Sequence, residues 1–227
     1  MAEVSVVLTS YNKPQWIGEA IESVLNQTYS DLELFVMEDN SPDEKTMEVI
    51  TKYESDPRLT IYNSQVKEQY RKSICRYAHL INLAVTQMST GKYITYLADD
   101  DIFYSDRLER MVNFLNDFPE ADIVYGTQDI ADIEMNIRGQ RGPFGILDNG
   151  WNKVDHNSVL HTRRVFFDAG GWDEDPGTWG GSDAHFWRRI HEKTSYLMYP
   201  LGGKPTEAKR YHEESVQWLI VNGTFYT

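Results

Sequence analysis

The sequence has little of what exported or membrane proteins carry. It contains a single cysteine, Cys75, which excludes an internal disulfide and any multi-cysteine metal site. Cys75 falls on the apolar stripe of a predicted helix, so we expect it to be packed in the core and unreactive. The longest apolar runs are a few residues, far short of the ~20 that span a bilayer, and the start MAEVSVVLTS lacks a secretory signal. We expect a cytoplasmic protein without a membrane span.

Positive charge is also scarce. The 227 residues include 22 Lys and Arg against 35 Asp and Glu, which gives a formal net charge of −13. Because affinity for a phosphate backbone comes largely from basic side chains, this charge argues against nucleic acid as a partner. An anionic small molecule can still bind to a protein of this net charge where a metal ion and a few local cations supply the attraction. The apolar content of 41% is enough for a sizeable core.

Short apolar segments alternate with amphipathic ones over the first 125 residues. The strands are expected at residues 4–10, 32–37, 59–62, 93–97 and 123–125. The helices between them are expected to begin near Asn12-Lys13-Pro14, at the capping-box spacing of residues 41–44, near Tyr70 and at Ser105, with the third running to Met88. This alternation predicts an α/β fold with a mostly parallel central sheet and helices on both faces.

The pattern changes after about residue 128. Residues 139–150, GQRGPFGILDNG, hold four glycines and a proline, and we expect a mobile loop or lid there. The segment VLHTRRVFFDAGGWDE predicts a short strand, a helix and a glycine turn. A helix over residues 183–193 and a strand over 196–199 follow, whereas the tail from residue 209 shows no clear pattern. The chain has no repeat and no long linker, which indicates one domain.

Polar side chains follow three of the predicted strands, at residues 9–12, 38–40 and 99–101. In an open parallel sheet, ligands bind beyond the carboxyl ends of the strands, so these groups should share one edge. Residues 99–101 are three consecutive aspartates, which repel one another unless a cation gathers them. The alternative is a solvated turn that caps the next helix.

Glycine-rich phosphate loops are missing as well. The first strand leads into TSYNKP, and neither this segment nor GGKP at residues 202–205 fits a phosphate-binding loop. A bound nucleotide would therefore need another partner for its phosphates. Mn²⁺ or Mg²⁺ held by carboxylates is the obvious substitute, since both ions favour oxygen ligands and bridge to phosphate.

Five segments carry a resemblance to a known family. TSYNK, ELFVMEDNS, RYAHLIN, YITYLADDDIFYSDRL and DHNSVLHTR occur in this order. Together they resemble glycosyltransferase family 2, the inverting enzymes of GT-A fold, and most closely its spore-coat polysaccharide branch. The resemblance covers about residues 3–195 and implies a GT-A (Rossmann-like) fold with a smaller acceptor-side subregion. It divides the single domain into a nucleotide-sugar-binding half, 1–127, and an acceptor-binding and catalytic-base half, 128–227.

The resemblance also implies how a nucleotide is held. Thr9, Tyr11 and Asp39 would contact a pyrimidine nucleoside, and Arg76 would help to hold the nucleotide. From the residues alone, Arg76 could equally be an exposed helix cation in an ordinary ion pair.

A metal site is implied next to the nucleotide. Asp99 would face the ribose, and Asp100 would bind the Mn²⁺ or Mg²⁺ that bridges both phosphates. Ala98 stands where the family's DxD motif usually has its first acid. His212, in YHEES, resembles a late histidine that completes the metal site in many GT-A enzymes, with a surface histidine as the alternative.

The catalytic base and the acceptor contacts fall in the second half. The resemblance places the base at Asp183, in GGSDAHFWRRI; locally it could simply be a helix N-terminal acid stabilised by the dipole. His156, in DHNS, would line the acceptor site. Trp172, Asp173 and Trp179 lie among glycines, where an aromatic ring could stack on a sugar or merely pack down the loop.

These observations lead to one function and two alternatives. The function is metal-dependent, inverting transfer of a single sugar from a UDP- or dTDP-sugar donor to a hydroxyl of a carbohydrate or glycoconjugate acceptor, in surface polysaccharide or glycoconjugate synthesis. A sugar-phosphate nucleotidyltransferase is one alternative, although it would normally show a glycine-rich basic loop after the first strand. A catalytically inactive nucleotide-sugar-binding module is the other, and Asp183 argues against it.

Overall fold

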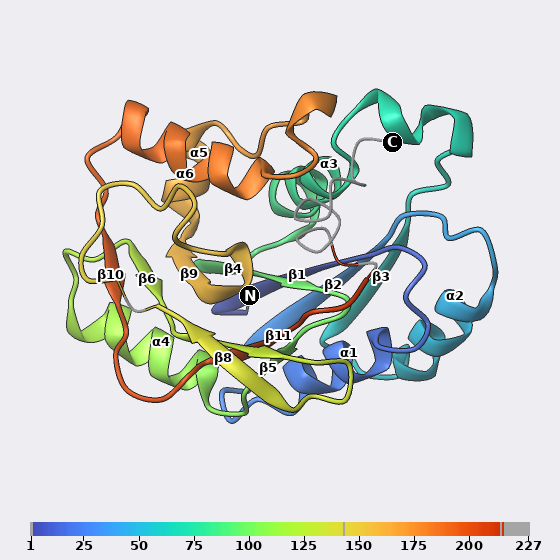
Figure 1. The fold of residues 1–227 in the computed structure, drawn as a ribbon, viewed down its shortest axis with the longest axis horizontal. Coiled ribbons are helices and arrows are strands. Elements are labelled where there is room, and N and C mark those ends of the chain that lie inside the picture. Colours follow the sequence, from blue (N-terminus) through green and yellow to red (C-terminus); the bar gives the residue numbers. More distant parts are fainter. Residues whose placement is uncertain (1, 143, 214, 216–227) are drawn as a thin grey trace.

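A seven-stranded sheet forms the centre of the computed structural model, which describes residues 2–142, 144–213 and 215 (Figure 1). The strand order is β10-β6-β9-β4-β1-β2-β3. Neighbouring strands are parallel except at β9, which is antiparallel to both β4 and β6. The bounds are β1 (Val4–Ser10), β2 (Leu32–Glu38), β3 (Leu59–Asn63), β4 (Tyr93–Ala98), β6 (Ile123–Tyr125), β9 (Val159–Thr162) and β10 (Met198–Pro200). The predicted mostly parallel sheet is confirmed.

Helices cover both faces of this sheet, as the alternating pattern predicted. One face carries α1 (Ile17–Leu25), α2 (Lys45–Ile50) and α4 (Arg107–Asp117), and the other carries α3 (Arg76–Leu83), α5 (Arg163–Ala169) and α6 (Ser182–Lys193) (Figure 1). Successive residues of β1 point to opposite faces: Val6 and Leu8 pack with the first group, whereas Val7 packs with the second. Burial on both faces explains why the central strands read as unbroken apolar runs.

The predicted helix starts near the pocket are wrong by a few residues. Asn12 adopts φ 56° and its backbone N–H donates to Ser41 Oγ at 2.9 Å, so it ends a turn and α1 begins only at Ile17. Ser41 donates its hydroxyl to the Glu38 carboxylate, and α2 begins only at Lys45. These polar residues tie the strand-end loops to one another instead of capping helices. Likewise, α4 begins after Asp106, not at Ser105.

The helix predicted from residue 70 to 88 is broken into three pieces. A 3₁₀ segment, η2 (Glu68–Ser73), precedes α3, and a π-helical turn, η3 (Ala84–Met88), follows it. Cys75 lies at the break, where its backbone N–H donates to the Glu174 carbonyl at 2.8 Å. It is fully buried, as expected, and burial raises the pKa of its thiol to about 11.

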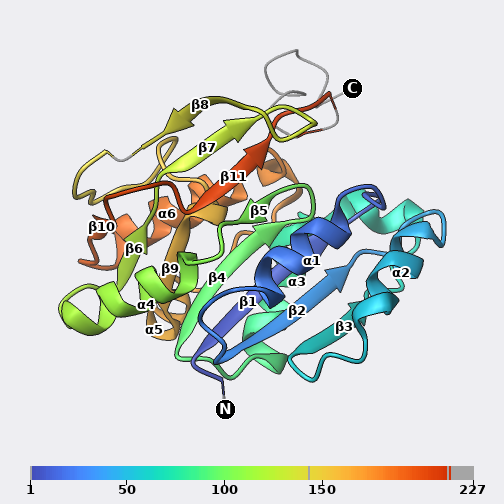
Figure 2. The same ribbon diagram turned by 90° about the horizontal axis from the view of Figure 1, so that it is seen from below.

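A second sheet, absent from the sequence prediction, lies beside the first (Figure 2). Its order is β5-β11-β7-β8, with β5 (Ile102–Phe103), β7 (Gln128–Ala131), β8 (Ile137–Arg141) and β11 (Glu207–Arg210). β8 takes up the first residues of the segment expected to be a loop over 139–150. β11 lies in the tail that showed no pattern, and it brings that tail back against the loop after β4. No helix in the described part of the chain is long and apolar enough to cross a membrane.

Candidate functional site

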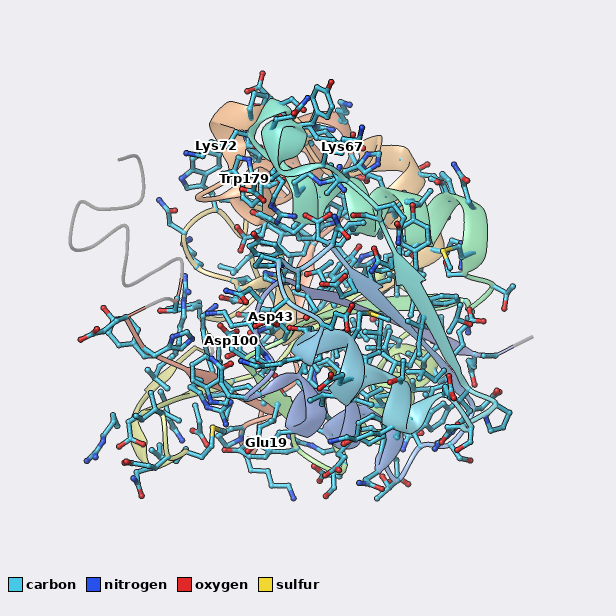
Figure 3. All side chains as sticks on the ribbon, turned by 90° about the vertical axis from the view of Figure 1, so that its right-hand side faces the viewer. Glu19, Asp43, Lys67, Lys72, Asp100 and Trp179 are labelled. Atoms are coloured by element: carbon cyan, nitrogen blue, oxygen red, sulfur yellow. The ribbon has the colours of Figure 1, made fainter. Side chains whose placement is uncertain are left out.

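A cavity of about 310 Å³ opens at the carboxyl ends of β1 and β4. Eight of the residues singled out from the sequence line it: Thr9, Tyr11, Asp39, Arg76, Asp99, Asp100, His156 and Asp183. Figure 3 shows Asp100 between Trp179, which also lines the cavity, and Glu19 of α1. Side chains from both halves of the sequence therefore meet in one place.

One end of the cavity is built around the carboxylate of Asp39, which is only 2% exposed. Arg76 Nη2 lies 2.6 Å from Asp39 Oδ1, and Arg71 Nη2 lies 2.9 Å from Asp39 Oδ2. The Arg71 guanidinium also covers the ring of Tyr11 at 3.4 Å from its centroid. Arg76 is thus buried in an ion pair, not an exposed helix cation, while Thr9 lies close by at the end of β1.

Arg71 is a residue that sequence reasoning missed. On one straight helix from residue 70, residues 71 and 76 would lie about 140° apart, because each residue turns the helix by about 100°. The actual break after η2 lets Arg71 and Arg76 reach the same carboxylate. A break in the helix near residue 74 would have been the signal that identifies Arg71, but the apolar periodicity of the sequence does not show this break.

The three consecutive aspartates have different environments. Asp99 Oδ2 accepts the backbone N–H of Tyr11 at 2.8 Å, and burial together with the charge of Asp100 raises its pKa to about 8. Asp101 is 1% exposed and accepts the backbone N–H of Arg210 at 2.7 Å and the side-chain amide of Asn157. Asp101 therefore ties β11 to the loop after β4, and only Asp99 and Asp100 line the cavity. The alternative of a solvated turn is wrong.

Asp100, in the lining of the cavity, is paired with His212. His212 Nε2 lies 2.9 Å from Asp100 Oδ2, and the imidazole, 7% exposed, packs on the ring of Trp16 at 4.3 Å. Burial alone would raise the pKa of Asp100, but the hydrogen bond with His212 and the charges of Lys13 and Lys209 outweigh it and hold the pKa below its ordinary value. His212 is thus not the surface histidine that the alternative required.

This pair fits a divalent cation of the Mn²⁺ or Mg²⁺ type. Adjacent ligands of an octahedral ion, each about 2.1 Å from the metal, lie about 3.0 Å apart, close to the observed separation of Asp100 Oδ2 and His212 Nε2. The carboxylate of Asp100 is a ligand type that suits both Mg²⁺ and Mn²⁺. Asp100 and His212 would hold such an ion, which would supply positive charge to a bound phosphate.

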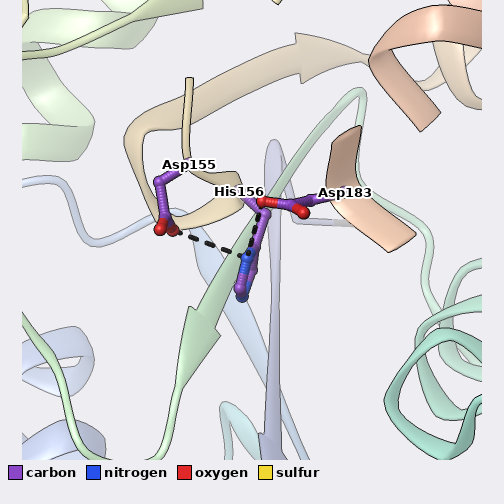
Figure 4. A group of neighbouring side chains, drawn as sticks. All are labelled: Asp155, His156 and Asp183. Carbon is purple, nitrogen blue, oxygen red and sulfur yellow. Dashed lines mark ion pairs between the residues drawn. The ribbon is translucent and has the colours of Figure 1, made fainter. Parts of the chain in front are cut away.

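A second group of ionisable side chains, Asp155, His156 and Asp183, also lines the cavity (Figure 4). His156 Nδ1 lies 3.5 Å from Asp155 Oδ1 and 3.8 Å from Asp183 Oδ2. Asp183 is in the first turn of α6, with Oδ1 accepting the backbone N–H of Ala184 at 2.8 Å and the side chain 24% exposed. A half-buried carboxylate beside an imidazole at a cavity wall is a reasonable proton acceptor.

The same three side chains are close enough to bind a metal, with one ligand atom from each lying within 4.8 Å of the others. However, Lys209 Nζ lies 2.6 Å from Asp155 Oδ2. Burial would lower the pKa of Lys209, but the carboxylates of Asp155, Asp101 and Asp100 raise it above its ordinary value, so the ammonium persists. Because Asp155 is already in direct contact with this ammonium, it is less suited to bind a cation than Asp100, which pairs with an imidazole.

Asp155 and Lys209 were both missed in the sequence. Asp155 directly precedes His156 in the DHNS segment, so its position was visible although its partner was not. Lys209 lies on β11, in the tail without a pattern. Nothing local in the sequence connects the two, which are 54 residues apart.

The structure places two expected acceptor residues elsewhere. Trp172 is 2% exposed and stacks on Phe186, with ring centroids 5.2 Å apart and planes at 14°. Its ring is part of the core and offers no surface to a sugar, which corrects the expectation. Asp173 pairs with Arg189 at 3.0 Å, outside the lining of the cavity. Trp179 is the aromatic ring of that segment that does line it.

The family of this protein follows from comparison with known families. A family model described as "Glycosyl transferase family 2" matches residues 5–171, about three quarters of the chain. The chain belongs to glycosyltransferase family 2. The resemblance that the sequence motifs carried is thereby confirmed.

Two relatives from Bacillus subtilis (strain 168) are similar to this chain. "Protein CgeD" is 41% identical over 206 residues, which cover 86% of this chain and 47% of CgeD. "Putative glycosyltransferase EpsE" is 32% identical over 196 residues, 84% of this chain and 67% of EpsE. The chain therefore spans about half of CgeD.

Solved structures share the fold. Staphylococcus aureus TarS 1–349 in complex with UDP-GlcNAc has a TM-score of 0.74 at 16% identity, over 95% of this chain and 60% of that one. The mannosyltransferase PcManGT from Pyrobaculum calidifontis, in complex with GDP-Man and Mn²⁺, has a TM-score of 0.69 at 17% identity, over 97% and 60%. At such identities the likeness concerns the fold alone, and the predicted GT-A fold is confirmed.

Proposed function

We propose that this protein is a metal-dependent, inverting glycosyltransferase that moves one sugar from a UDP- or dTDP-sugar to a hydroxyl of a carbohydrate or glycoconjugate acceptor. One observation carries the proposal: Asp100, which is paired with His212 at 2.9 Å, and Asp183 line the same cavity. A leaving diphosphate needs a cation, which Asp100 and His212 would hold. An attacking hydroxyl needs a base, which Asp183 would supply. The UDP-GlcNAc bound in TarS and the GDP-Man and Mn²⁺ bound in PcManGT support it.

The nucleoside would occupy the end of the cavity near Thr9, Tyr11 and Asp39. There Asp39 is held by Arg71 and Arg76, and Asp99 faces the same space. Asp100 and His212 would hold Mn²⁺ or Mg²⁺, which when bound would neutralise charge on the departing diphosphate.

Asp183 would act as the base. As the acceptor oxygen bonds to the anomeric carbon, its proton passes to the Asp183 carboxylate, and the bond from the anomeric carbon to the diphosphate oxygen breaks. The transition state resembles an oxocarbenium ion. Because base and diphosphate lie on opposite sides of the sugar, the anomeric configuration inverts. His156 beside Asp183 would line the acceptor side together with Trp179.

The biological setting is a further part of the proposal. Synthesis of a surface polysaccharide or glycoconjugate follows from the motif resemblance, and the single buried cysteine suits the reducing cytoplasm. The match to glycosyltransferase family 2 favours sugar transfer over the nucleotidyltransferase alternative. Asp183 at the cavity wall favours an active enzyme over a binding module.

The test is a calorimetric titration of the purified protein with UDP and with dTDP, with and without Mn²⁺. We expect Mn²⁺-dependent binding that Asp100→Ala abolishes. Asp148→Ala, a variant of an aspartate whose side chain is 73% exposed and outside the cavity, should bind as the unmodified protein does. Failure of both nucleotides to bind with Mn²⁺ present would overturn the proposal.

A further inference from the structure

Lys209 lies among the acidic side chains of the cavity. Its ammonium lies 2.6 Å from Asp155 Oδ2, and Asp155 adjoins His156, which faces Asp183. Lys209 also lines the cavity together with Asp100, and its side chain is 14% exposed. A cation that is largely shielded from water, and aimed into a pocket, interacts more strongly with a ligand than one on the surface.

The cavity needs positive charge at this place. Asp99, Asp100, Asp155 and Asp183 all line it, and the diphosphate of a sugar nucleotide adds further negative charge. The arginines of the lining are committed elsewhere. Arg71 and Arg76 hold Asp39, as described above, and Arg210 donates to Glu19 at 2.6 Å and to the carbonyl of Asp100 at 3.1 Å.

Lys209 keeps donor capacity to spare. An ammonium has three N–H donors, and within the described part of the chain Asp155 is the hydrogen-bond acceptor that Lys209 has. Two donors therefore stay available to a ligand in the cavity. Lys209 lines the same cavity as Asp100 and Asp183, which places these donors in the space that the two carboxylates share.

We propose that Lys209 binds the distal phosphate of the donor's diphosphate, next to the oxygen that leaves the sugar. This inference rests on the proposed function. The diphosphate would lie by Asp100 and the anomeric carbon within reach of Asp183, so the phosphate that joins them falls between these residues, where Lys209 lies. When the bond from the anomeric carbon to oxygen breaks, the electron pair stays on that oxygen, and the ammonium stabilises the added charge.

A purely structural role would give a different result. If Lys209 served only to hold Asp155 and the His156 loop in place, removing either partner of the ion pair would have the same effect. If Lys209 binds the donor, removal of Lys209 weakens binding. Loss of the Asp155 charge would instead leave binding unchanged or strengthen it, because the ammonium is freed and one repelling carboxylate is gone.

The experiment compares UDP with UMP by calorimetry, in Mn²⁺ and in EDTA. Lys209→Met should weaken UDP binding about tenfold or more while UMP, which lacks the distal phosphate, changes by less than about twofold. Lys209→Arg, which keeps the charge, should stay within about threefold of the unmodified protein for UDP. The matched control is Lys204→Met, an exposed lysine outside the cavity, which should change neither affinity.

Asp155→Asn completes the design. UDP affinity equal to or above that of the unmodified protein supports the donor role. Equal losses in Lys209→Met and Asp155→Asn, or equal losses for UDP and UMP, would overturn it. Lys209→Gln replaces Lys209→Met should the latter fail to fold. Absence of UDP binding by the unmodified protein would instead count against the proposed function, whereas normal UDP binding by Lys209→Met would refute this inference alone.

Discussion

His212 Nε2 lies 2.9 Å from Asp100 Oδ2, although 112 residues separate them in the chain. Asp100 is positioned by the end of β4. His212 lies two residues after the end of β11, and β11 pairs with β5, which follows the loop that holds Asp100. The small second sheet therefore has a role in the site. It carries the last part of the described chain to the aspartates and places His212 beside Asp100.

We expect His212→Ala to lower the Mn²⁺-dependent affinity for UDP at least about tenfold, because it removes one of the two side chains that we propose as metal ligands. In EDTA the same variant should bind UDP within about twofold of the unmodified protein. Calorimetry in both conditions measures this. His191→Ala, a variant of a half-exposed histidine outside the cavity, is the control. A loss of equal size with and without metal would show that His212 acts on the nucleotide directly.

We expect Asp183→Asn to lower the rate of sugar transfer by a factor of about 10² to 10⁴, since an amide cannot accept the proton of the attacking hydroxyl. UDP affinity should be preserved, because in the proposed function Asp183 contacts the acceptor hydroxyl and not the nucleotide. The measurement is UDP release from a donor found by screening UDP- and dTDP-sugars, with calorimetry in parallel. Asp148→Asn serves as the matched control. Transfer at the normal rate would remove Asp183 from the base role.

The sequence was informative where one residue's environment is set by its neighbours in the chain. Central strands such as β1 and β4 are continuous apolar runs, and α1 and α4 carry a clear apolar stripe. Polar residues at the strand ends then predict the cavity, because carboxyl ends of parallel strands share an edge. The loops that hold Asp39, Asp99 and Asp100 were predicted in this way, whereas the separate role of each residue came from the family resemblance.

The remaining parts depend on contacts between distant segments. β11, with the sequence EAKR, is buried although three of its four residues carry charge, because Glu207, Lys209 and Arg210 each find a partner far away in the chain. No local pattern in the sequence predicts such a strand. Trp172 shows the converse, since its glycine-rich surroundings indicate a surface loop whereas its ring packs in the core.

His161 provides a pH-dependent test of the fold away from the cavity. It is fully buried on β9, where Nε2 accepts from the Tyr96 hydroxyl and Nδ1 donates to the Thr162 carbonyl, each at 2.8 Å. Burial lowers the pKa of His161 to about 4 from the ordinary 6.5. The neutral ring is therefore the form that the folded state prefers.

Between pH 4 and 6.5 the unfolded chain binds a proton at His161 that the folded chain does not. The free energy of unfolding should therefore fall as the pH is lowered through this window, by about 3 kcal/mol in total for His161. Above pH 6.5 the stabilising contribution of the neutral ring is fully present. Urea unfolding of the unmodified protein and of His161→Gln at several pH values isolates the contribution as a difference. A difference that does not vary with pH would contradict the assignment.

The pair of Arg107 and Glu207 tests how the second sheet is attached. Both side chains are fully buried, with Arg107 Nε 3.5 Å from Glu207 Oε2, and burial lowers the pKa of Arg107 to about 10. Arg107 also donates through Nη2 to the carbonyls of Asn157 and Val159. The pair thus holds β11 against α4 and the start of β9.

We expect Glu207→Gln to lower the free energy of unfolding by about 3–5 kcal/mol, because it leaves a buried guanidinium without its counter-charge. The double variant Glu207→Gln, Arg107→Met should be less destabilised than the sum of its single variants, since it removes the unpaired charge as well. Urea unfolding measures all three, with the exposed Glu120→Gln as control. If Glu207→Gln unfolded like that control, the attachment of β11 would rest on its backbone pairing with β7 and β5, and the charge pair would be incidental to it.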